Sequence, residues 1–498
     1  MNLLRFLPVC FLCSLLFNTN TSSQQITKKL TLDDVVNIAH EQSLQSILAK
    51  HRFRGSYWEY RTYKAKYLPN LTLSSTIFNF DRSIMLSPSF ENGQWVDKIG
   101  TSKSLNSSGQ LNLNQNIGLT GGSVFLSSRL TRSDLLQGDS LVKFVSSPVS
   151  IGFRQPINGY NELHWEKKIE PKRFEEAKQQ YIDAMESVSL RAVEFFFDLA
   201  LAQMNLEISK INYNNTDTLY KIAQGRFNMG TIAEDELLQL ELSHLKANTS
   251  LNRASIELES NKSRLGVFLG FSENIDLELI VPVRIPDLEI NVQKALEEAN
   301  KNNPDIIGLE RQLLEAEQNV AEARSERGLN ATLFASFGLT KEAPDLRRVY
   351  TNPQDQQQVQ VGIDVPIVDW GLGRGKVKLA ESNHQVVMTS VQQDKVDFEQ
   401  QVLLSVMQFN LQDDQILIAA KADTVATYRY EVAKRRFLIG KIDVLELNVA
   451  LEEKDVARRE YIAALREFWD YYYNLRKLTL FDFRTNMPLS ASFDDLLK

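Results

Sequence analysis

The chain has 498 residues, with 56 Lys and Arg against 63 Asp and Glu, which gives a formal net charge of −7. This balance argues against a nucleic-acid-binding protein, because such proteins concentrate positive charge where they meet the phosphates. Both cysteines, Cys10 and Cys13, lie in the first 23 residues, so the rest of the chain cannot form a disulfide.

Residues 1–23 have the pattern of a secretory signal peptide. Arg5 precedes an apolar stretch over residues 6–17, and polar residues follow up to Ser23, after which cleavage would leave Gln24 as the first residue. The apolar stretch, about 12 residues, is too short to span a bilayer as a helix, and no run of about 18 apolar residues follows it. An exported chain of this kind is therefore either soluble or crosses a membrane as a β-barrel.

Six long segments are rich in Glu, Lys, Gln, Ala and Leu and predict helices. From Ile182 to Leu206 the apolar residues recur every three or four positions, as in a coiled coil. A helix of about 65 residues would be roughly 100 Å long, which exceeds the needs of an ordinary globular core. The predicted helices cover residues 31–66, about 165–228, about 231–268, 291–327, about 374–438 and about 443–478.

Segments in which apolar and polar residues alternate lie between these helices and predict strands with one apolar face. They include residues 71–75, 331–339 and 359–367, and a hairpin at 111–119 and 124–130 around the turn Thr120-Gly121-Gly122. Runs of about 9 to 11 residues suit tilted transmembrane strands, although a soluble sheet with one buried face alternates in the same way.

The chain contains an internal duplication. Arg226, Phe227 and Gly230 recur as Arg436, Phe437 and Gly440, and 436 − 226 = 210. Nearer the start the offset is 260, as in Asn70 and Asn330, so the first copy carries about 50 extra residues between Asn70 and Gly152. A repeat of about 200 residues is far longer than a solenoid repeat and predicts two similar halves. The predicted division is a signal peptide at 1–23, a first repeat at 24–285, a second repeat at 286–478 and a C-terminal tail at 479–498.

In the minimal interpretation each half supplies two strands. Four strands cannot close a barrel, and open edges in lipid would leave backbone polar groups unpaired. Closure then requires other copies of the chain. Three copies would give 12 strands, or 18 if the hairpin at 111–130 joins the sheet, and the sequence leaves these two alternatives open.

Several motifs resemble the outer membrane efflux protein family, the TolC-like channels. The motifs are Leu-Thr-Leu at 30–32, Leu-Pro-Asn-Leu at 68–71, Pro-Ile-Val-Asp at 366–369 with Gly371 and Gly373, and the two Arg-Phe-x-x-Gly turns at 226–230 and 436–440. Each motif alone is degenerate, but their duplicated order extends over residues 30–478.

The resemblance implies an α+β fold in which long antiparallel coiled-coil helices form an α-helical barrel in the periplasm. This barrel would join a transmembrane antiparallel β-barrel, completed by trimerisation, in the outer membrane. It also implies a passive exit duct for efflux or type I secretion, which works with a periplasmic adaptor protein and an inner-membrane pump. The alternative is a soluble periplasmic coiled-coil adaptor without channel activity. Neither interpretation involves an enzyme or a cofactor, and the five histidines form no closely spaced pair.

The resemblance assigns two roles to the turns. Arg226, Phe227, Gly230, Arg436, Phe437 and Gly440 would contact the adaptor, although a glycine that ends a helix and an arginine near a helix end also have local explanations. Glu446, with Asp443, would form a periplasmic constriction when three copies bring these carboxylates around one axis. Asp443 followed by Glu446 is equally the pattern of a helix N-terminal capping box.

Overall fold

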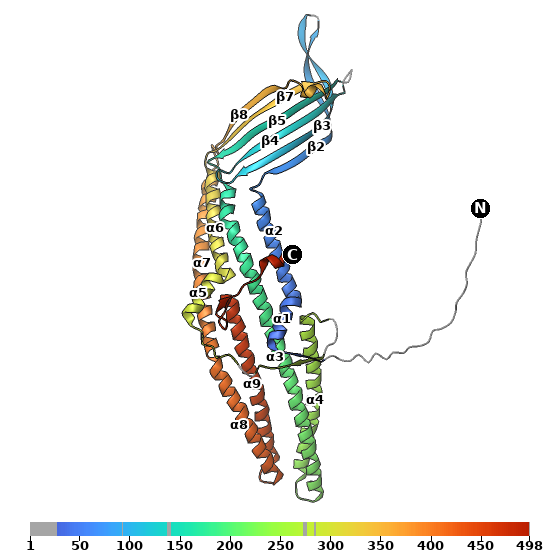
Figure 1. Cartoon of the computed structure of the whole chain (residues 1–498), viewed down its shortest axis with the longest axis vertical. Coiled ribbons are helices and arrows are strands. Elements are labelled where there is room, and N and C mark those ends of the chain that lie inside the picture. Colours follow the sequence, from blue (N-terminus) through green and yellow to red (C-terminus); the bar gives the residue numbers. More distant parts are fainter. Residues whose placement is uncertain (1–26, 92, 137–140, 272–275, 283–284, 498) are drawn as a thin grey trace, which may run out of the picture. The chain divides into compact units, whose positions relative to one another are not determined.

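The computed structural model describes residues 27–91, 93–136, 141–271, 276–282 and 285–497, so the predicted signal peptide and its two cysteines lie outside the described residues. Within this part, six antiparallel strands form one sheet in the order β2-β3-β4-β5-β7-β8 (Figure 1). β2 and β8 are the two ends of that order, so the described strands of one chain leave the sheet open. The strands are β2 Asn70–Glu91, β3 Gln94–Ile117, β4 Gly122–Leu135, β5 Leu141–Ile157, β7 Asn330–Ala343 and β8 Gln354–Asp364.

The predicted hairpin around residues 120–122 is part of this sheet. β3 pairs with β4 without a register shift, from Ser104 opposite Leu135 to Ile117 opposite Gly122, and Gly121 in the turn has a φ of +72°. The minimal expectation of four strands per chain is therefore corrected to six. On the N-terminal side of Ser104, β3 pairs only with β2. These two strands extend past the others as a two-stranded ribbon (Figure 1).

All six predicted helical segments occur, but three of them are interrupted where we expected continuous helices. Ser43 and Asn303 have extended backbone, with ψ angles of 144° and 131°, and the third break falls at Leu411. The helices are α1 Leu32–Gln42, α2 Leu44–Ala65, α3 Glu162–Asn228, α4 Glu234–Phe268, α5 Val292–Asn302, α6 Pro304–Arg327, α7 Leu372–Asn410, α8 Gln412–Leu438 and α9 Val444–Thr479.

Side-chain hydrogen bonds lie at two of these breaks. The Asn303 side chain accepts a hydrogen bond of 2.8 Å from the Asp305 amide, and Pro304 takes the first helical position, which needs no amide donor. At the other break, Asn410 bonds both backbone polar groups of Ile290, each at 3.0 Å, and so holds a non-helical segment against the end of α7. Among the described residues no helix is both long enough and apolar enough to cross a membrane.

The duplication is visible in the element boundaries. α3 begins at Glu162 and ends at Asn228, and α7 with α8 covers Leu372 to Leu438, which is the same span displaced by 210 residues. The breaks at Ser43 and Asn303 differ by 260, as do the first residues of β2 and β7. The hairpin of β3 and β4 has no counterpart in the second copy. It accounts for the extra residues of the first copy.

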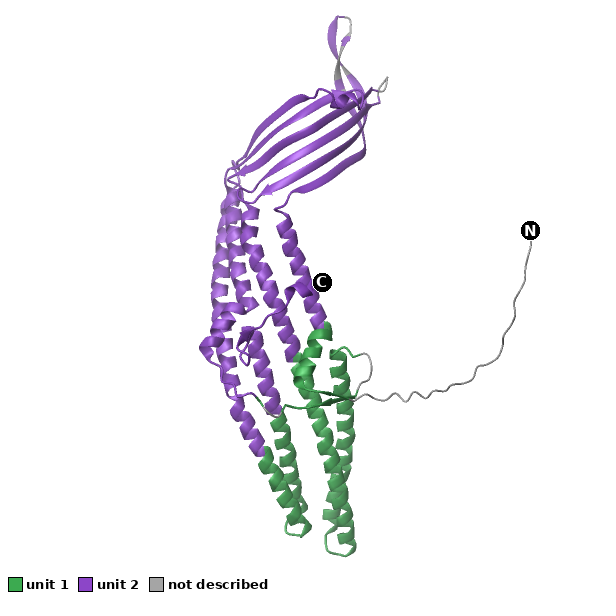
Figure 2. Ribbon diagram, viewed as in Figure 1, with its two compact units in different colours: residues 1–44, 191–285, 423–462 green, residues 45–190, 286–422, 463–498 purple. Residues whose placement is uncertain are grey.

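Two compact units divide the chain in a way that cuts across this repeat (Figure 2). Unit 1 comprises residues 1–44, 191–285 and 423–462, and unit 2 comprises residues 45–190, 286–422 and 463–498. In unit 1, strands β1 Thr27–Leu30 and β6 Asp276–Leu279 pair in parallel, and Thr31 begins α1 with a capping box to Asp34. Unit 2 holds the six-stranded sheet.

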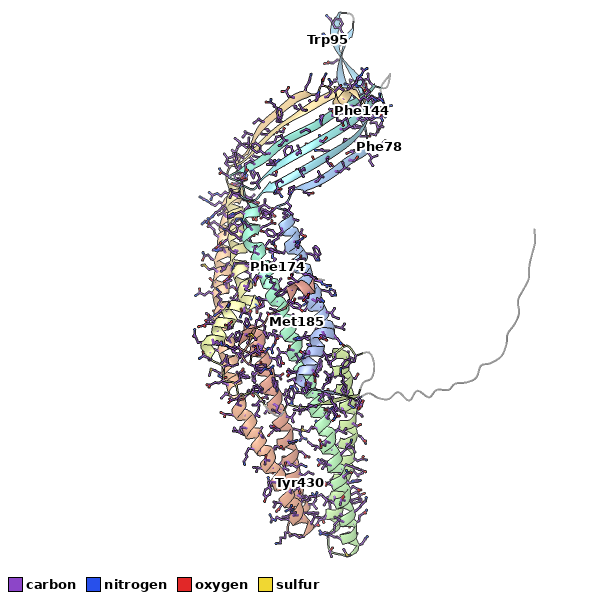
Figure 3. The ribbon with its side chains drawn as sticks, in the orientation of Figure 1. Phe78, Trp95, Phe144, Phe174, Met185 and Tyr430 are labelled. Atoms are coloured by element: carbon purple, nitrogen blue, oxygen red, sulfur yellow. The ribbon has the colours of Figure 1, made fainter. Side chains whose placement is uncertain are left out.

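Aromatic side chains form much of the helical core of unit 2. Phe174, labelled in Figure 3, stacks on Tyr60 with ring centroids 4.4 Å apart. The C-terminal tail joins the same core, since the ring of Phe493 lies 5.1 Å from that of Phe53 and the Leu496 carbonyl accepts a hydrogen bond from Arg54. The tail also contains β9 Phe481–Asp482, β10 Met487–Pro488 and α10 Phe493–Leu496. An aromatic cluster of α9 is buried as well and includes Trp469, Tyr472 and Tyr473.

A buried charged group lies within this core. Glu186 of α3 accepts a hydrogen bond of 3.0 Å from Arg476 of α9, and only 3% of the residue is exposed. Burial disfavours the charged carboxylate and raises the pKa of Glu186 to about 7, although Arg476 opposes the shift. Burial likewise raises the pKa of Asp183, one turn away, to about 6. Both carboxyls therefore hold their protons more strongly in the folded chain than in the unfolded chain.

This difference predicts that the chain is more stable to heat at pH 6 than at pH 8. The folded state binds more protons than the unfolded state between the ordinary carboxyl pKa and about 7, so the free energy of unfolding falls as the pH rises through that window. Glu186→Gln should reduce the difference in unfolding midpoint between the two pH values, measured by circular dichroism. The control Glu467→Gln changes an exposed residue of α9. An unaltered difference in the Glu186 variant would contradict the assignment.

Candidate functional site

The two duplicated turns have the same backbone geometry. Gly230 and Gly440 have φ angles of +71° and +72°, a conformation that glycine adopts without strain. In each turn the amide after the glycine donates a 2.9 Å hydrogen bond to the carbonyl of the motif arginine, from Thr231 to Arg226 and from Lys441 to Arg436. This is the bond pattern of a helix that ends with a left-handed residue, so both glycines have a structural role.

The helix after the second turn begins at a carboxylate. The Glu446 amide donates a hydrogen bond of 2.8 Å to the Asp443 side chain, which therefore caps α9. The side chains of both residues are exposed. At the first turn, α4 begins without a side-chain cap, and its first turn carries Glu234, Asp235 and Glu236. Both helix starts thus present carboxylates, which the positive end of the helix dipole stabilises.

Behind the turns, a small hydrophobic cluster joins four helices of unit 1. It consists of Ala223, Leu240, Tyr430, Phe437, Val444 and Leu447, and we call it the tip cluster. Tyr430, labelled in Figure 3, accepts a hydrogen bond of 3.2 Å from Asn215 of α3, so its hydroxyl is satisfied inside the packing. The cluster fixes the spacing of the two helix pairs at their turns.

The predicted adaptor-contact residues fall into two groups. Phe437 is 7% exposed within the tip cluster, and Arg226 donates a hydrogen bond of 3.1 Å to the Leu438 carbonyl, with its guanidinium 6.0 Å from the Phe437 ring. These two side chains bind one turn to the other. Phe227 is 38% exposed, and Arg436 is exposed as well. The equivalent positions of the repeat therefore have different surroundings.

An open groove between α8 and α9 brings two predicted residues together. It has a volume of about 520 Å³, and both Arg436 and Glu446 line it. Its apolar lining includes the exposed side chains of Val432, Leu445 and Val449. Its charged lining consists of Arg429, Arg436 and Glu446. An apolar groove with charges of both signs in its lining is suited to receive a protein segment of mixed character.

The sheet of unit 2 has two chemically distinct faces, set by the strand register. One row across five strands reads Leu71, Leu113, Leu126, Ile151 and Phe337, each directly opposite the next. The neighbouring row on the other face reads Asn114, Phe125, Gly152, Ser336 and Gln358. Much of the apolar face is exposed in one chain, with Ile151 at 50% and Val361 at 59%. An apolar sheet face of this extent requires a cover other than water.

Some of these features have sequence signals, and others do not. The glycines, the cap at Asp443 and the alternating strands follow local rules. The bond from Arg226 to Leu438 connects residues 212 positions apart, and the groove combines two helices, so neither has a local signature.

Long helix pairs joined to a sheet with one apolar and one polar face are the elements that the resemblance to TolC-like channels implies. Residues 295–479 match the model of the family described as outer membrane efflux protein, so the resemblance predicted from the sequence motifs is confirmed. No curated protein matches the chain by sequence.

Solved channels share the fold. The Campylobacter jejuni CmeC outer membrane channel has a TM-score of 0.66 at 17% identity, covering 93% of this chain and 88% of that one. The Vibrio cholerae outer membrane protein VceC has a TM-score of 0.64 at 16% identity, covering 90% and 95%. The open state of the Neisseria gonorrhoeae MtrE channel has a TM-score of 0.61 at 14% identity, covering 90% and 88%. The family match and this fold agree with the predicted location in the outer membrane, with the helices in the periplasm.

The link between the two turns predicts the effect of Arg226→Gln. Removing the bond to the Leu438 carbonyl and the contact with Phe437 should destabilise the second turn by about 1 kcal/mol. We expect faster amide hydrogen exchange at residues 436–441. The control Arg436→Gln changes the equivalent arginine, whose side chain is exposed, and should leave exchange at residues 226–231 unaltered. Equal exchange rates at residues 436–441 in wild type and Arg226→Gln would contradict the proposed link.

Proposed function

We propose that three copies of this chain form an outer-membrane exit duct that passively conducts substrates of an efflux or type I secretion system. The observation that carries the proposal is the open six-stranded sheet, apolar on one face and polar on the other. In a bilayer the free edges of β2 and β8 would leave backbone polar groups without partners. Pairing β8 of one copy with β2 of the next removes both edges, and three copies close a barrel of 3 × 6 = 18 strands.

The strand dimensions suit this role. β4 has 14 residues, and at about 3.3 Å per residue it is roughly 46 Å long, enough to cross the hydrocarbon core at a tilt of about 45°. The apolar face would then meet lipid and the polar face would line water. A barrel with this number of strands leaves an aqueous channel. The polar face supplies amide and hydroxyl groups to that channel.

The turns of unit 1 are proposed to meet the partners. A periplasmic adaptor would dock at the two turns through Phe227, Gly230, Arg436 and Gly440 and the groove beside α9. Arg226 and Phe437 would hold these turns in position from within the chain. An inner-membrane pump would supply the energy.

The carboxylates at the start of α9 are proposed to form the constriction. Glu446 and Asp443 are exposed in one chain, so their charge is available at an interface with other copies. Three copies would place six carboxylates near one axis, which attracts small cations.

The soluble adaptor is the second candidate. A soluble protein would have to cover the apolar sheet face by other means, which disfavours it. Mass measurement of the detergent-solubilised protein, combined with single-channel recording in planar bilayers, separates the two. Trimers with discrete conductance steps are expected from the duct, whereas a monomer recovered in the soluble periplasm and never inserting would overturn it.

Glu446→Gln should reduce the cation preference of the channel. Three carboxylates are lost from the constriction, so the reversal potential in a KCl gradient should shift toward zero. The control is Glu452→Gln. Glu452 lies on the same helix as Glu446 but about 120° away from it around the helix axis, so this variant should have the reversal potential of the wild-type channel. Unchanged selectivity in a conducting Glu446 variant would remove the proposed role of this residue while leaving the duct intact.

A further inference from the structure

The polar face of the sheet is almost free of charge. Across the stretch of the sheet that β7 covers from Thr332 to Thr340, most side chains of this face are Ser, Thr, Asn, Gln or Gly. They include Gln110, Asn112 and Asn114 on β3, and every second residue of β8 from Gln354 to Gln360 is a glutamine. On the described strand segments of this face, at residues 72–76, 108–116, 123–129, 150–154, 332–340 and 354–360, the charged side chains are those of Arg129 and Arg154. These segments of the face are therefore mostly uncharged and hydrogen-bonding, and their two charged side chains are both positive.

Arg154 belongs to an aromatic platform that interrupts this lining. Phe125 of β4 and Phe334 of β7 stack at 5.7 Å with an angle of 15° between their planes, although β5 runs between their strands. The guanidinium carbon of Arg154 lies 6.0 Å from the centre of the Phe334 ring. Phe125 and Phe334 are half-buried, and Arg154 is exposed, so the charged group is open to solvent on this face.

Gly152 makes the platform possible. It lies on β5 directly between Phe125 and Ser336, and a Cβ atom there would come within 2.6 Å of the Phe125 ring and 2.5 Å of the Ala335 carbonyl oxygen. No other residue type leaves room for the ring to lie across the strand. The glycine is thus required by the aromatic contact and not by its own backbone angle.

Arg129 lies further from the helices on the same face. Its Nε donates a hydrogen bond of 2.9 Å to the Gln110 side chain on the neighbouring strand. Six residues of β4 separate it from Ser123, the partner of Arg154, which corresponds to about 20 Å along the strand. The two arginines therefore act at different levels.

We infer that this face binds aromatic organic anions transiently during their passage, with the anionic group on Arg154 and the ring against Phe125 and Phe334. The inference rests on the proposed function, which turns this face toward the lumen. Guanidinium groups pair with sulfonates and carboxylates through parallel hydrogen bonds, and phenyl rings offer a stacking surface. Arg129 supplies a second, weaker anion contact further along the path.

Block of single-channel current by pyrenetetrasulfonate, added to either side in turn, tests the inference on the full-length trimer. Wild-type channels should be blocked, and the block should weaken in about 1 M KCl because salt screens the arginines. Arg154→Gln should raise the half-blocking concentration by about tenfold or more, since a charge-assisted hydrogen bond is lost in each copy. Phe334→Leu should raise it less, and Arg129→Gln least.

Matched controls define the site. Arg132 lies on β4 three residues from Arg129, but its side chain is on the other face of the sheet, where it is paired with Ser107 of β3. The Arg132→Gln channel should therefore be blocked by pyrenetetrasulfonate as strongly as the wild-type channel. Ethanedisulfonate, which lacks a ring, and a trimethylammonium derivative of pyrene, which lacks the negative charge, should both block poorly. Migration of each variant as a heat-modifiable trimer on a gel shows that it has assembled.

Two failures can be told apart. Conducting trimers whose block is the same in wild type and Arg154→Gln would overturn the aromatic-anion site and leave the duct standing. The absence of any conductance from wild-type protein would overturn the duct and the inference together. Equal weakening by Arg132→Gln and Arg154→Gln would show a general effect of charge, which also overturns the site.

Discussion

The constraint on which this structure depends is the pairing of backbone groups at the edges of one sheet. Six strands in a single chain satisfy each other's hydrogen bonds except at β2 and β8. Because side chains alternate, a shift of one residue in any pairing would mix the apolar and polar faces. The register of β3 on β4 is free of shifts, and the shifts on β5 lie between residues 146 and 150, so the row that contains Ile151 is paired directly across from β4 to β7. The separation of the faces, and with it the role of the sheet, follows from that register.

In the two copies of the repeat, similar sequence motifs form similar turns, but equivalent side chains have different surroundings. Gly230 and Gly440 end their helices with nearly identical angles, and Ser43 and Asn303 interrupt theirs at equivalent positions. Phe227 and Phe437 occupy equivalent sites, yet only Phe437 enters the tip cluster. The divergence arises from packing, because Phe437 contacts other helices of unit 1. A repeated motif therefore fixes the backbone turn without fixing the surroundings of each side chain.

The sequence predicted the helices, the two turns and the alternating strands because each depends on neighbours along the chain. It did not predict the break at Leu411, which lies beside a contact between Asn410 and Ile290, residues 120 positions apart. Nor could it decide whether the hairpin at 111–130 joins the sheet, since an edge hairpin and a central one alternate alike. The Pro after Asn303 was a usable signal for a helix start, whereas Ser43 offered a weaker one. Of the site, the turn residues were found from sequence, and the groove, the tip cluster and the aromatic platform required the fold.

The side chains of the polar face suit a channel that binds its substrate weakly better than a site that binds it tightly. A conduit must bind its cargo well enough to admit it and weakly enough to release it. Arg154 is exposed and borders the rings without being enclosed by them, so a bound anion would keep much of its water and leave readily. A buried arginine in a closed pocket would bind more tightly and would slow transport. Gly152 contributes to this weak binding because it lets two half-buried rings stack beside the guanidinium. Across the stretch that β7 covers from Thr332 to Thr340, the other described side chains of this face, apart from Arg129, are uncharged.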